Sequence, residues 1–164
     1  MKNIFNHLIF LCFLLCPFLN TSAQQENNVL NYSMESRWTD DVDPGNLYPE
    51  YPRPQMARDN WVNLNGYWDY AIKGKGENKP NEYDGEILVP FPAESELSEV
   101  KKLVGSSNYL WYKKEVEIDQ KNNGEKTLLH FGAVDWETTV FVNGRKVGSH
   151  KGGYDPFNFD ISDF

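Results

Sequence analysis

Aromatic side chains in predicted loops are the residues of this sequence best placed to do chemistry. Trp136 and Tyr154 both lie between stretches of strand-forming residues. Exposed indole and phenol rings stack on the apolar faces of sugar rings, so both are candidate carbohydrate contacts. Packing inside the protein is the favoured interpretation, because aromatic side chains are mostly well buried. Trp61, Trp68 and Trp111 lie in or beside predicted strands and are expected in the core.

The carboxylates of the chain are candidate catalysts of glycoside cleavage. That reaction needs two carboxyl groups flanking one bond, roughly 5–5.5 Å apart for retention of configuration and 6.5–9.5 Å for inversion. Asn81-Glu82 is a dipeptide that some glycosidases use around the acid/base. It lies in a loop rich in Gly and Pro with no preceding strand, so a solvated loop is the favoured interpretation. We assign no catalytic residue.

Candidate metal ligands occur as an acidic cluster and as two histidines. Asp40, Asp41 and Asp43 could bind calcium, but the segment lacks the glycine and the closing glutamate of an EF-hand loop. A solvated acidic turn is favoured there. His130 is predicted on a strand, pointing away from its apolar neighbours, and His150 in a turn, neither with a nearby second ligand. We expect no metal and no cofactor.

The charge balance bears on partners. The 164 residues carry a formal net charge of −8. This acidity argues against nucleic acid and against an anionic membrane surface as partners. It is compatible with a neutral ligand such as a sugar, although acidity also simply keeps exported proteins soluble.

Residues 1–23 have the pattern of a secretory signal peptide. Lys2 supplies the positive charge, residues 4–19 are mostly apolar, and Thr21-Ser22-Ala23 offers small residues for cleavage. The apolar run is too short for a membrane anchor. We therefore expect export to the periplasm or the extracellular space.

Both cysteines lie within this signal. Leu11 precedes Cys12 and Leu15 precedes Cys16, so the small residue that lipoprotein processing requires is absent. The mature chain has no cysteine, which excludes disulfides, cysteine-bound metals and cysteine nucleophiles.

Residues 24–56 are predicted to form an extended arm on a domain surface. Four prolines forbid a regular helix: Pro44, Pro49, Pro52 and Pro54. Four side chains are too apolar for a free linker: Trp38, Leu47, Tyr48 and Tyr51. A proline-rich recognition segment is the alternative.

Residues 57–164 predict an all-β domain. Six to eight short strand patterns occur at the spacing of a sandwich or barrel, and no helical pattern reaches ten residues. The expected strands cover 61–72, 86–89, 109–118, 127–134, 139–142, 145–148 and 157–161. Residues 93–104 could form a helical turn or a loop. Because the chain stops directly after a strand, we expect the domain to be incomplete at its C-terminus.

The clearest local signal is a hairpin. Strand formers at Thr139–Val142 are followed by Asn143-Gly144, which favours a type I′ turn, and by a second short strand. Gly152-Gly153 then begins a turn, and Phe157, Phe159 and Ile161 alternate with polar residues, as in a half-buried strand.

A series of short motifs carries a family resemblance. In order they are Leu64-Asn65-Gly66 before Trp68, Val89-Pro90-Phe91-Pro92, Trp111–Val116, Phe131–Val134, Val140–Gly148 and Gly152–Phe157. Tyr51 to Phe164 resembles the N-terminal sugar-binding domain of glycoside hydrolase family 2, which includes β-galactosidases, β-glucuronidases and β-mannosidases. The resemblance implies a jelly-roll, galactose-binding-like β-sandwich. It also implies a following immunoglobulin-like domain and a (β/α)₈ barrel, whose two glutamates hydrolyse O-glycosyl bonds with retention.

Those glutamates have no counterpart in this chain, so the fragment alone is expected to be inactive. Some family members reach the substrate pocket through a long insertion, whereas residues 90–108 here are short, so no substrate-binding residue is carried over. The expected partners are a β-glycoside or polysaccharide and C-terminal domains of the same protein. Two alternatives stay open: a stand-alone carbohydrate-binding or interaction module, and a structural adhesion domain.

Overall fold

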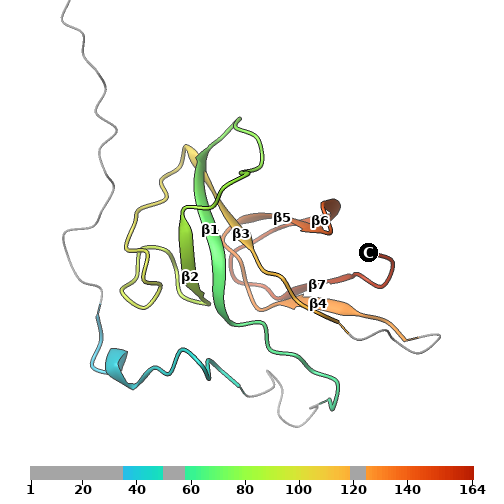
Figure 1. The fold of residues 1–164 in the computed structure, drawn as a ribbon, viewed down its shortest axis with the longest axis horizontal. Helices are drawn as coiled ribbons and strands as arrows, with labels where there is room; N and C mark the ends of the chain where they lie inside the picture. The colour runs from blue at the N-terminus through green and yellow to red at the C-terminus, as the bar shows by residue number, and fades with distance from the viewer. Residues whose placement is uncertain (1–34, 50–57, 119–124) are drawn as a thin grey trace, which may run out of the picture. The chain divides into compact units, whose positions relative to one another are not determined.

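The computed structural model describes residues 35–49, 58–118 and 125–164 (Figure 1). Over these residues the regular structure consists of seven strands and the short 3₁₀ helix η1 (Thr39–Asp41). The expected all-β class is confirmed. The expected signal peptide lies outside the described residues. The chain divides into two compact units, Met1–Lys114 and Glu115–Phe164, which are described separately.

The first unit contains a three-stranded antiparallel sheet. The central strand β1 (Gly66–Gly74) pairs with β2 (Gly85–Val89) on one side and with β3 (Asn108–Lys113) on the other (Figure 1). β2 agrees with its prediction, but β1 and β3 are shorter than expected. Val62 is 76% exposed, so the alternation before Gly66 does not mark a strand face.

The core of this unit is small and lies around β2. One buried cluster contains Tyr70, Ile87, Ala93 and Val100, and Ala71 and Leu88 are buried as well. The connection after β2 is a loop that packs back on the strand: the Leu88 amide donates to the Ser98 carbonyl over 3.1 Å. Ser98 is itself fully buried, and its hydroxyl donates to the Ala93 carbonyl at 3.1 Å and to the Ser95 carbonyl at 2.8 Å. The connection is therefore an ordered part of the core.

The three tryptophans expected in the core are only partly buried. Trp68 packs against the buried cluster, and its indole nitrogen donates to the Leu64 carbonyl at 2.8 Å. Trp61 and Trp111 have the same intermediate burial. A sheet of three strands covers too little area to bury rings of this size fully.

Beyond the end of β2, two carboxylates accept the hydrogen bonds from β1 that a neighbouring strand would otherwise accept. The Ile72 amide donates to Asp84 Oδ2 at 2.8 Å, and the Gly74 amide donates to Glu77 Oε1 at 2.7 Å. Burial raises the pKa of Asp84, but hydrogen bonds from Ile72 and Lys73 outweigh it and hold that pKa below 3.8. These side chains satisfy the backbone donors of β1 where β2 no longer reaches them.

The described part of the N-terminal arm is held by two asparagines. Asn63 Nδ2 donates to the carbonyls of Leu47 at 2.9 Å and Tyr48 at 3.0 Å, and Asn65 Nδ2 donates to Leu47 at 3.3 Å. Leu47 is 6% exposed, whereas Trp38 and Tyr48 remain exposed. The arm is therefore attached to this unit at Leu47.

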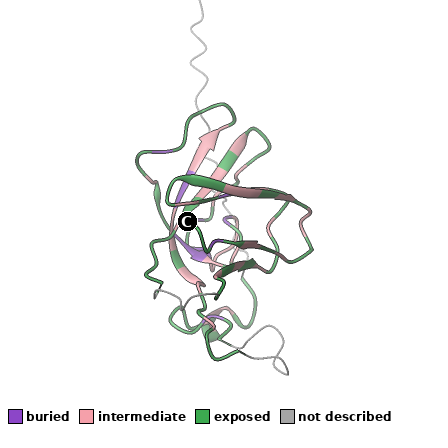
Figure 2. Cartoon of the chain, turned by 90° about the vertical axis from the view of Figure 1, so that its right-hand side faces the viewer, coloured by how far each residue is buried: buried purple, intermediate pink, exposed green. Residues whose placement is uncertain are grey.

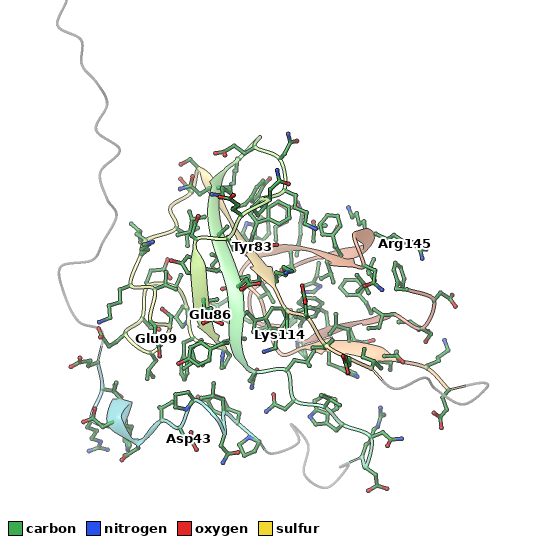
Figure 3. All side chains as sticks on the ribbon, in the orientation of Figure 1. Asp43, Tyr83, Glu86, Glu99, Lys114 and Arg145 are labelled. Carbon is green, nitrogen blue, oxygen red and sulfur yellow. The ribbon has the colours of Figure 1, made fainter. Side chains whose placement is uncertain are left out.

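Two side-chain contacts fix the start of β1. The Tyr67 hydroxyl donates to Glu99 Oε1 at 2.8 Å, and Lys114 Nζ donates to the Tyr67 carbonyl at 2.6 Å. Figure 3 labels Glu99 and Lys114. The hydrogen bond to Glu99 raises the pKa of Tyr67. Both contacts join residues distant in sequence, so they tie the loop after β2 and the end of β3 to β1.

The second unit contains two antiparallel strand pairs. β4 (Leu128–Phe131) pairs with β7 (Phe157–Asp160), and β5 (Glu137–Val142) pairs with β6 (Arg145–Lys151) (Figure 1). The predicted hairpin is confirmed: Asn143 has φ 49° and Gly144 has φ 78°. β6 runs further than predicted, so His150 lies in a strand opposite Thr138 and the expected turn at this residue is wrong.

Aromatic stacking forms the interior of this unit. The Phe157 ring stacks on Phe131 at 4.8 Å and on His150 at 4.1 Å between centroids. Phe159 meets Phe157 edge to face at 5.8 Å and lies against Gly148. A methyl group on Gly148 would overlap the Phe159 ring. The absence of a side chain at Gly148 therefore lets the two strand pairs approach. Figure 2 shows that few of the described residues are buried.

Replacing Gly148 should destabilise the second unit. Gly148→Ala places Cβ inside the Phe159 ring, and such overpacking costs about 1–3 kcal/mol. This outweighs the roughly 0.4–1 kcal/mol that alanine contributes by restricting the unfolded chain. Urea unfolding followed by circular dichroism measures the difference. Gly132→Ala is the control, because a Cβ there meets nothing within 4 Å. Equal stability of the two variants would contradict this packing.

A charged cluster closes the open end of the β4–β7 pair. Asp160 accepts hydrogen bonds from Lys126 Nζ at 2.7 Å and from the Ser162 amide at 3.1 Å. The Ser162 hydroxyl in turn accepts from the Thr127 amide at 3.0 Å. The hydrogen bonds from Lys126 and then Ser162 lower the pKa of Asp160 from 3.8 to about 2.

The stabilisation from Asp160 should depend on pH. The folded-state pKa lies below the unfolded value, so the contribution is complete above pH 3.8 and is lost as pH falls towards about 2. Asp160→Asn should therefore lower the melting temperature at pH 7, and the difference from the native chain should shrink over that range. Thermal melts from pH 7 to pH 2 measure it. Asp59→Asn, at an exposed position, is the matched control for the loss of one carboxylate. A difference for Asp160→Asn that persists at pH 2 would refute the assignment.

Candidate carbohydrate-contact site

Strand pairing brings two loops of the second unit together. Residues 132–136 connect β4 to β5, and residues 152–156 connect β6 to β7. The pair Phe131↔Phe157 ends one ladder, and the pair Glu137↔Lys151 ends the other. Both loops therefore leave from matching strand ends. The Gly152 amide donates to the Trp136 carbonyl at 2.8 Å and joins them.

The two loops also approach closely at a glycine. A Cβ on Gly153 would lie 2.8 Å from Asp135 Oδ1 and 3.3 Å from its Cγ. Only glycine leaves room for the Asp135 side chain at this separation. The Asp135–Trp136 peptide bond is cis. The loops thus form a joined surface, which we call the 132–136/152–156 loop pair.

The loop pair presents the two candidate aromatic residues to solvent. Trp136 is 60% exposed and Tyr154 is 96% exposed. The favoured interpretation of both as packing residues is therefore wrong. The physical reason is that strand pairing ends at Phe131↔Phe157 and at Glu137↔Lys151, before either residue. Neither ring therefore packs on the Phe131–Phe157 stack.

One charged side chain lies near the Trp136 ring, and others lie in or beside the loop pair. Lys151 Nζ lies 5.5 Å from the Trp136 ring centroid and pairs with Glu137 at 3.2 Å. Asp135 and Asp155 lie in the two loops themselves. The loop pair and the adjoining strand ends thus carry three carboxylates and one ammonium group. Carboxylates of this kind can accept hydrogen bonds from sugar hydroxyl groups.

Two polar atoms lie beneath the loop pair without a hydrogen-bond partner among the described residues. They are Thr138 Oγ1 and His150 Nε2, and their residues are opposite each other across β5 and β6. A Cβ on Gly152 would lie 3.5 Å from His150 Nε2. No local sequence pattern predicts this pair, because the juxtaposition depends on a register shift between Val140 and Phe141.

The other sequence candidates lie outside the 132–136/152–156 loop pair. Asn81 and Glu82 are exposed in the β1–β2 connection. Asp40 and Asp41 are exposed in η1, and Asp43 accepts a hydrogen bond from the Gly45 amide at 2.9 Å. His130 lies on the exposed face of β4, as predicted.

The described residues contain neither a cluster of metal ligands nor a membrane-spanning helix. No group of three or more His, Cys, Asp or Glu side chains in this part of the chain has an arrangement that could hold a metal ion. No helix within the same ranges has both the length and the apolar character needed to span a membrane.

Comparison with known proteins identifies the class of domain. The sequence model described as glycosyl hydrolases family 2, sugar binding domain, matches residues 51–164. The antiparallel all-β architecture is consistent with a β-sandwich of this kind. The chain belongs to glycoside hydrolase family 2 through this sugar-binding domain.

Curated relatives match over part of their length. A β-galactosidase of Thermoanaerobacter pseudethanolicus is 46% identical over 54 residues, which are 33% of this chain and 7% of the relative. A β-glucuronidase of Streptococcus agalactiae is 32% identical over 109 residues, 65% of this chain and 18% of the relative. The β-glucuronidase of Sus scrofa is 27% identical over 133 residues, 72% of this chain and 20% of the relative. The chain thus spans at most a fifth of these relatives.

Proposed function

We propose that this chain is the N-terminal domain of an exported β-glycosidase that hydrolyses O-glycosyl bonds with retention in carbohydrate metabolism. The observation that carries the proposal is the family match over residues 51–164. Relatives named β-galactosidase and β-glucuronidase support a glycosidase as the whole protein. In this proposal, catalysis belongs to a barrel outside this chain.

The domain itself contributes binding and assembly. Its candidate acid/base dipeptide, Asn81-Glu82, lies in an exposed connection and not beside the loop aromatics in sequence or strand pairing. Retaining hydrolysis needs a second carboxylate roughly 5–5.5 Å away across a bound sugar. The exposed Trp136 and Tyr154 instead favour contact with carbohydrate.

A hydrolysis assay tests whether catalysis lies in domains outside this chain. The 164-residue chain should not hydrolyse p-nitrophenyl β-D-galactoside or β-D-glucuronide. The same chain joined to the remaining domains of its protein should hydrolyse one of them, and proton NMR should show the β-anomer as the first product. Turnover by the 164-residue chain would refute the assignment of catalysis to other domains. An α-anomer as first product would refute retention.

A stand-alone carbohydrate-binding module is the second candidate function. The exposed aromatic pair favours it, because a binding module needs no catalytic carboxylates. The assay above distinguishes the two: sugar binding without hydrolysis by the complete protein supports the module, and hydrolysis supports the enzyme.

Export is tested by the position of the mature N-terminus. Cleavage after Ala23 should leave Gln24 as the first residue, because residues 21–23 supply the small side chains that signal peptidase accepts. Intact-mass spectrometry of the protein from the periplasm or medium measures this. Ala23→Lys should block cleavage, whereas Asn28→Lys should not. A full-length chain retained in the cytoplasm would contradict export.

A further inference from the structure

We propose that Asn143 is a site of spontaneous covalent modification, at which deamidation to aspartate and isoaspartate loosens the β5–β6 hairpin. The proposal does not rest on the proposed function, because it concerns the chemistry of the chain itself and needs no ligand. Its structural consequences lie within the second unit, residues 115–164.

The reaction joins the Asn143 side chain to the next backbone nitrogen. The Gly144 nitrogen attacks Asn143 Cγ; the N–Cγ bond forms, the Cγ–Nδ2 bond breaks, and ammonia leaves with the proton that the Gly144 amide gives up. Solvent water then opens the cyclic succinimide. Cleavage of the new N–Cγ bond gives aspartate. Cleavage of the original peptide bond gives isoaspartate, in which the main chain runs through Cβ and Cγ.

The hairpin turn leaves the reacting groups accessible. Asn143 and Gly144 lie beyond the last ladder pair, Val142↔Arg145, so strand pairing holds neither of them. Both residues are exposed to the water that the second step consumes. A Cβ on Gly144 would meet nothing within 4 Å, and glycine has no side chain of its own to hinder attack at its nitrogen.

A second Asn-Gly pair in the described residues lacks this freedom. Asn65 and Gly66 are half-buried, and Gly66 is paired with Val89 in the β1–β2 ladder. Asn65 Nδ2 donates to the Leu47 carbonyl at 3.3 Å. Attack on Asn65 Cγ requires this side chain to turn, which breaks that hydrogen bond. Loss of one such bond slows the reaction roughly two- to tenfold. The structure therefore assigns different reactivities to two identical dipeptides.

Isoaspartate at position 143 would alter the backbone on which the turn depends. A type I′ turn requires positive φ at both central residues, and here φ is 49° at Asn143 and 78° at Gly144. Isoaspartate adds a carbon atom to the main chain at this point. The turn then no longer matches the register of the two strands, and the adjoining pair Val142↔Arg145 is the first to be lost.

Arg145 connects this turn to the segment that follows β7. Arg145, labelled in Figure 3, donates from Nη1 to the Asp163 carbonyl at 3.1 Å. Its guanidinium carbon lies 4.6 Å from the centroid of the Phe164 ring. Residues 162–164 follow the β4–β7 ladder, so strand pairing does not hold them. Displacement of Arg145 should therefore loosen this segment.

Peptide mapping of aged protein tests the site. The full chain is incubated at mildly alkaline pH, which favours loss of the amide proton, and samples are digested at intervals. Tandem mass spectrometry follows replacement of the side-chain NH₂ by OH, and protein isoaspartyl methyltransferase labels the isoaspartate. Asn143 should react roughly two- to tenfold faster than Asn65. In urea the two rates should become equal, because the difference comes from the fold.

The outcomes of this comparison are distinct. Equal rates in the folded chain, or faster reaction at Asn65, would overturn the proposal. A difference that persists unchanged in urea would also overturn it, because it would then not depend on the fold. Asn123-Gly124 lies outside the described residues and in a separate tryptic peptide, so it does not enter the comparison.

Two variants separate the chemistry from its structural effect. Asn143→Gly leaves a Gly-Gly turn and has no side-chain amide to lose. Asn143→Asp carries the charge of one product without the longer backbone. Hydrogen exchange of the Ser162 and Phe164 amides should accelerate in the aged native chain but not in aged Asn143→Gly or fresh Asn143→Asp. Unchanged exchange in native chain that carries isoaspartate would overturn the connection through Arg145. Acceleration in fresh Asn143→Asp would overturn the role of the backbone.

Discussion

The stack of Phe131, Phe157 and His150 is the interaction on which the second unit depends. Phe131 and Phe157 are paired across β4 and β7, while His150 comes from β6. The stack therefore joins two strand pairs that share no ladder. Because aromatic rings supply large buried area in a compact space, three side chains can do this in a unit with few buried residues. The direction of both loops follows from it, since each loop begins where a stacked strand ends.

Local chemistry made part of this fold predictable. Asn143 and Gly144 favour positive φ, so the hairpin could be placed to the residue. The strand at Phe157 follows from alternation, and β2 follows from a short apolar run before Pro90. The residues at which strands begin and end were harder to predict from the sequence. The alternation before β1 continues past the point where a pairing partner exists, and the length of β6 depends on hydrogen bonds to β5 that no local pattern encodes.

The candidate site was predictable in composition but not in environment. Trp136 and Tyr154 could be singled out because aromatic residues between strands are chemically suited to sugars. Their exposure could not, because burial depends on what the neighbouring strands cover. Thr138 Oγ1 and His150 Nε2, which have no hydrogen-bond partner among the described residues, were beyond sequence reasoning for a related reason. Their juxtaposition follows from one irregularity in the hairpin, and a shift of one residue would send each side chain to the opposite face.

The carboxylates that follow β1 beyond β2 have a consequence for the protein in concentrated solution. An unpaired row of backbone amides is a template on which a strand from another molecule can add. Here the amides of Ile72 and Gly74 are occupied by Asp84 and Glu77 from the same chain. An incoming strand would have to displace two charged side chains before it gained a hydrogen bond. This part of the β1 edge is thereby protected from intermolecular strand addition. The irregular β1–β2 connection, which supplies both carboxylates, thus also protects against aggregation.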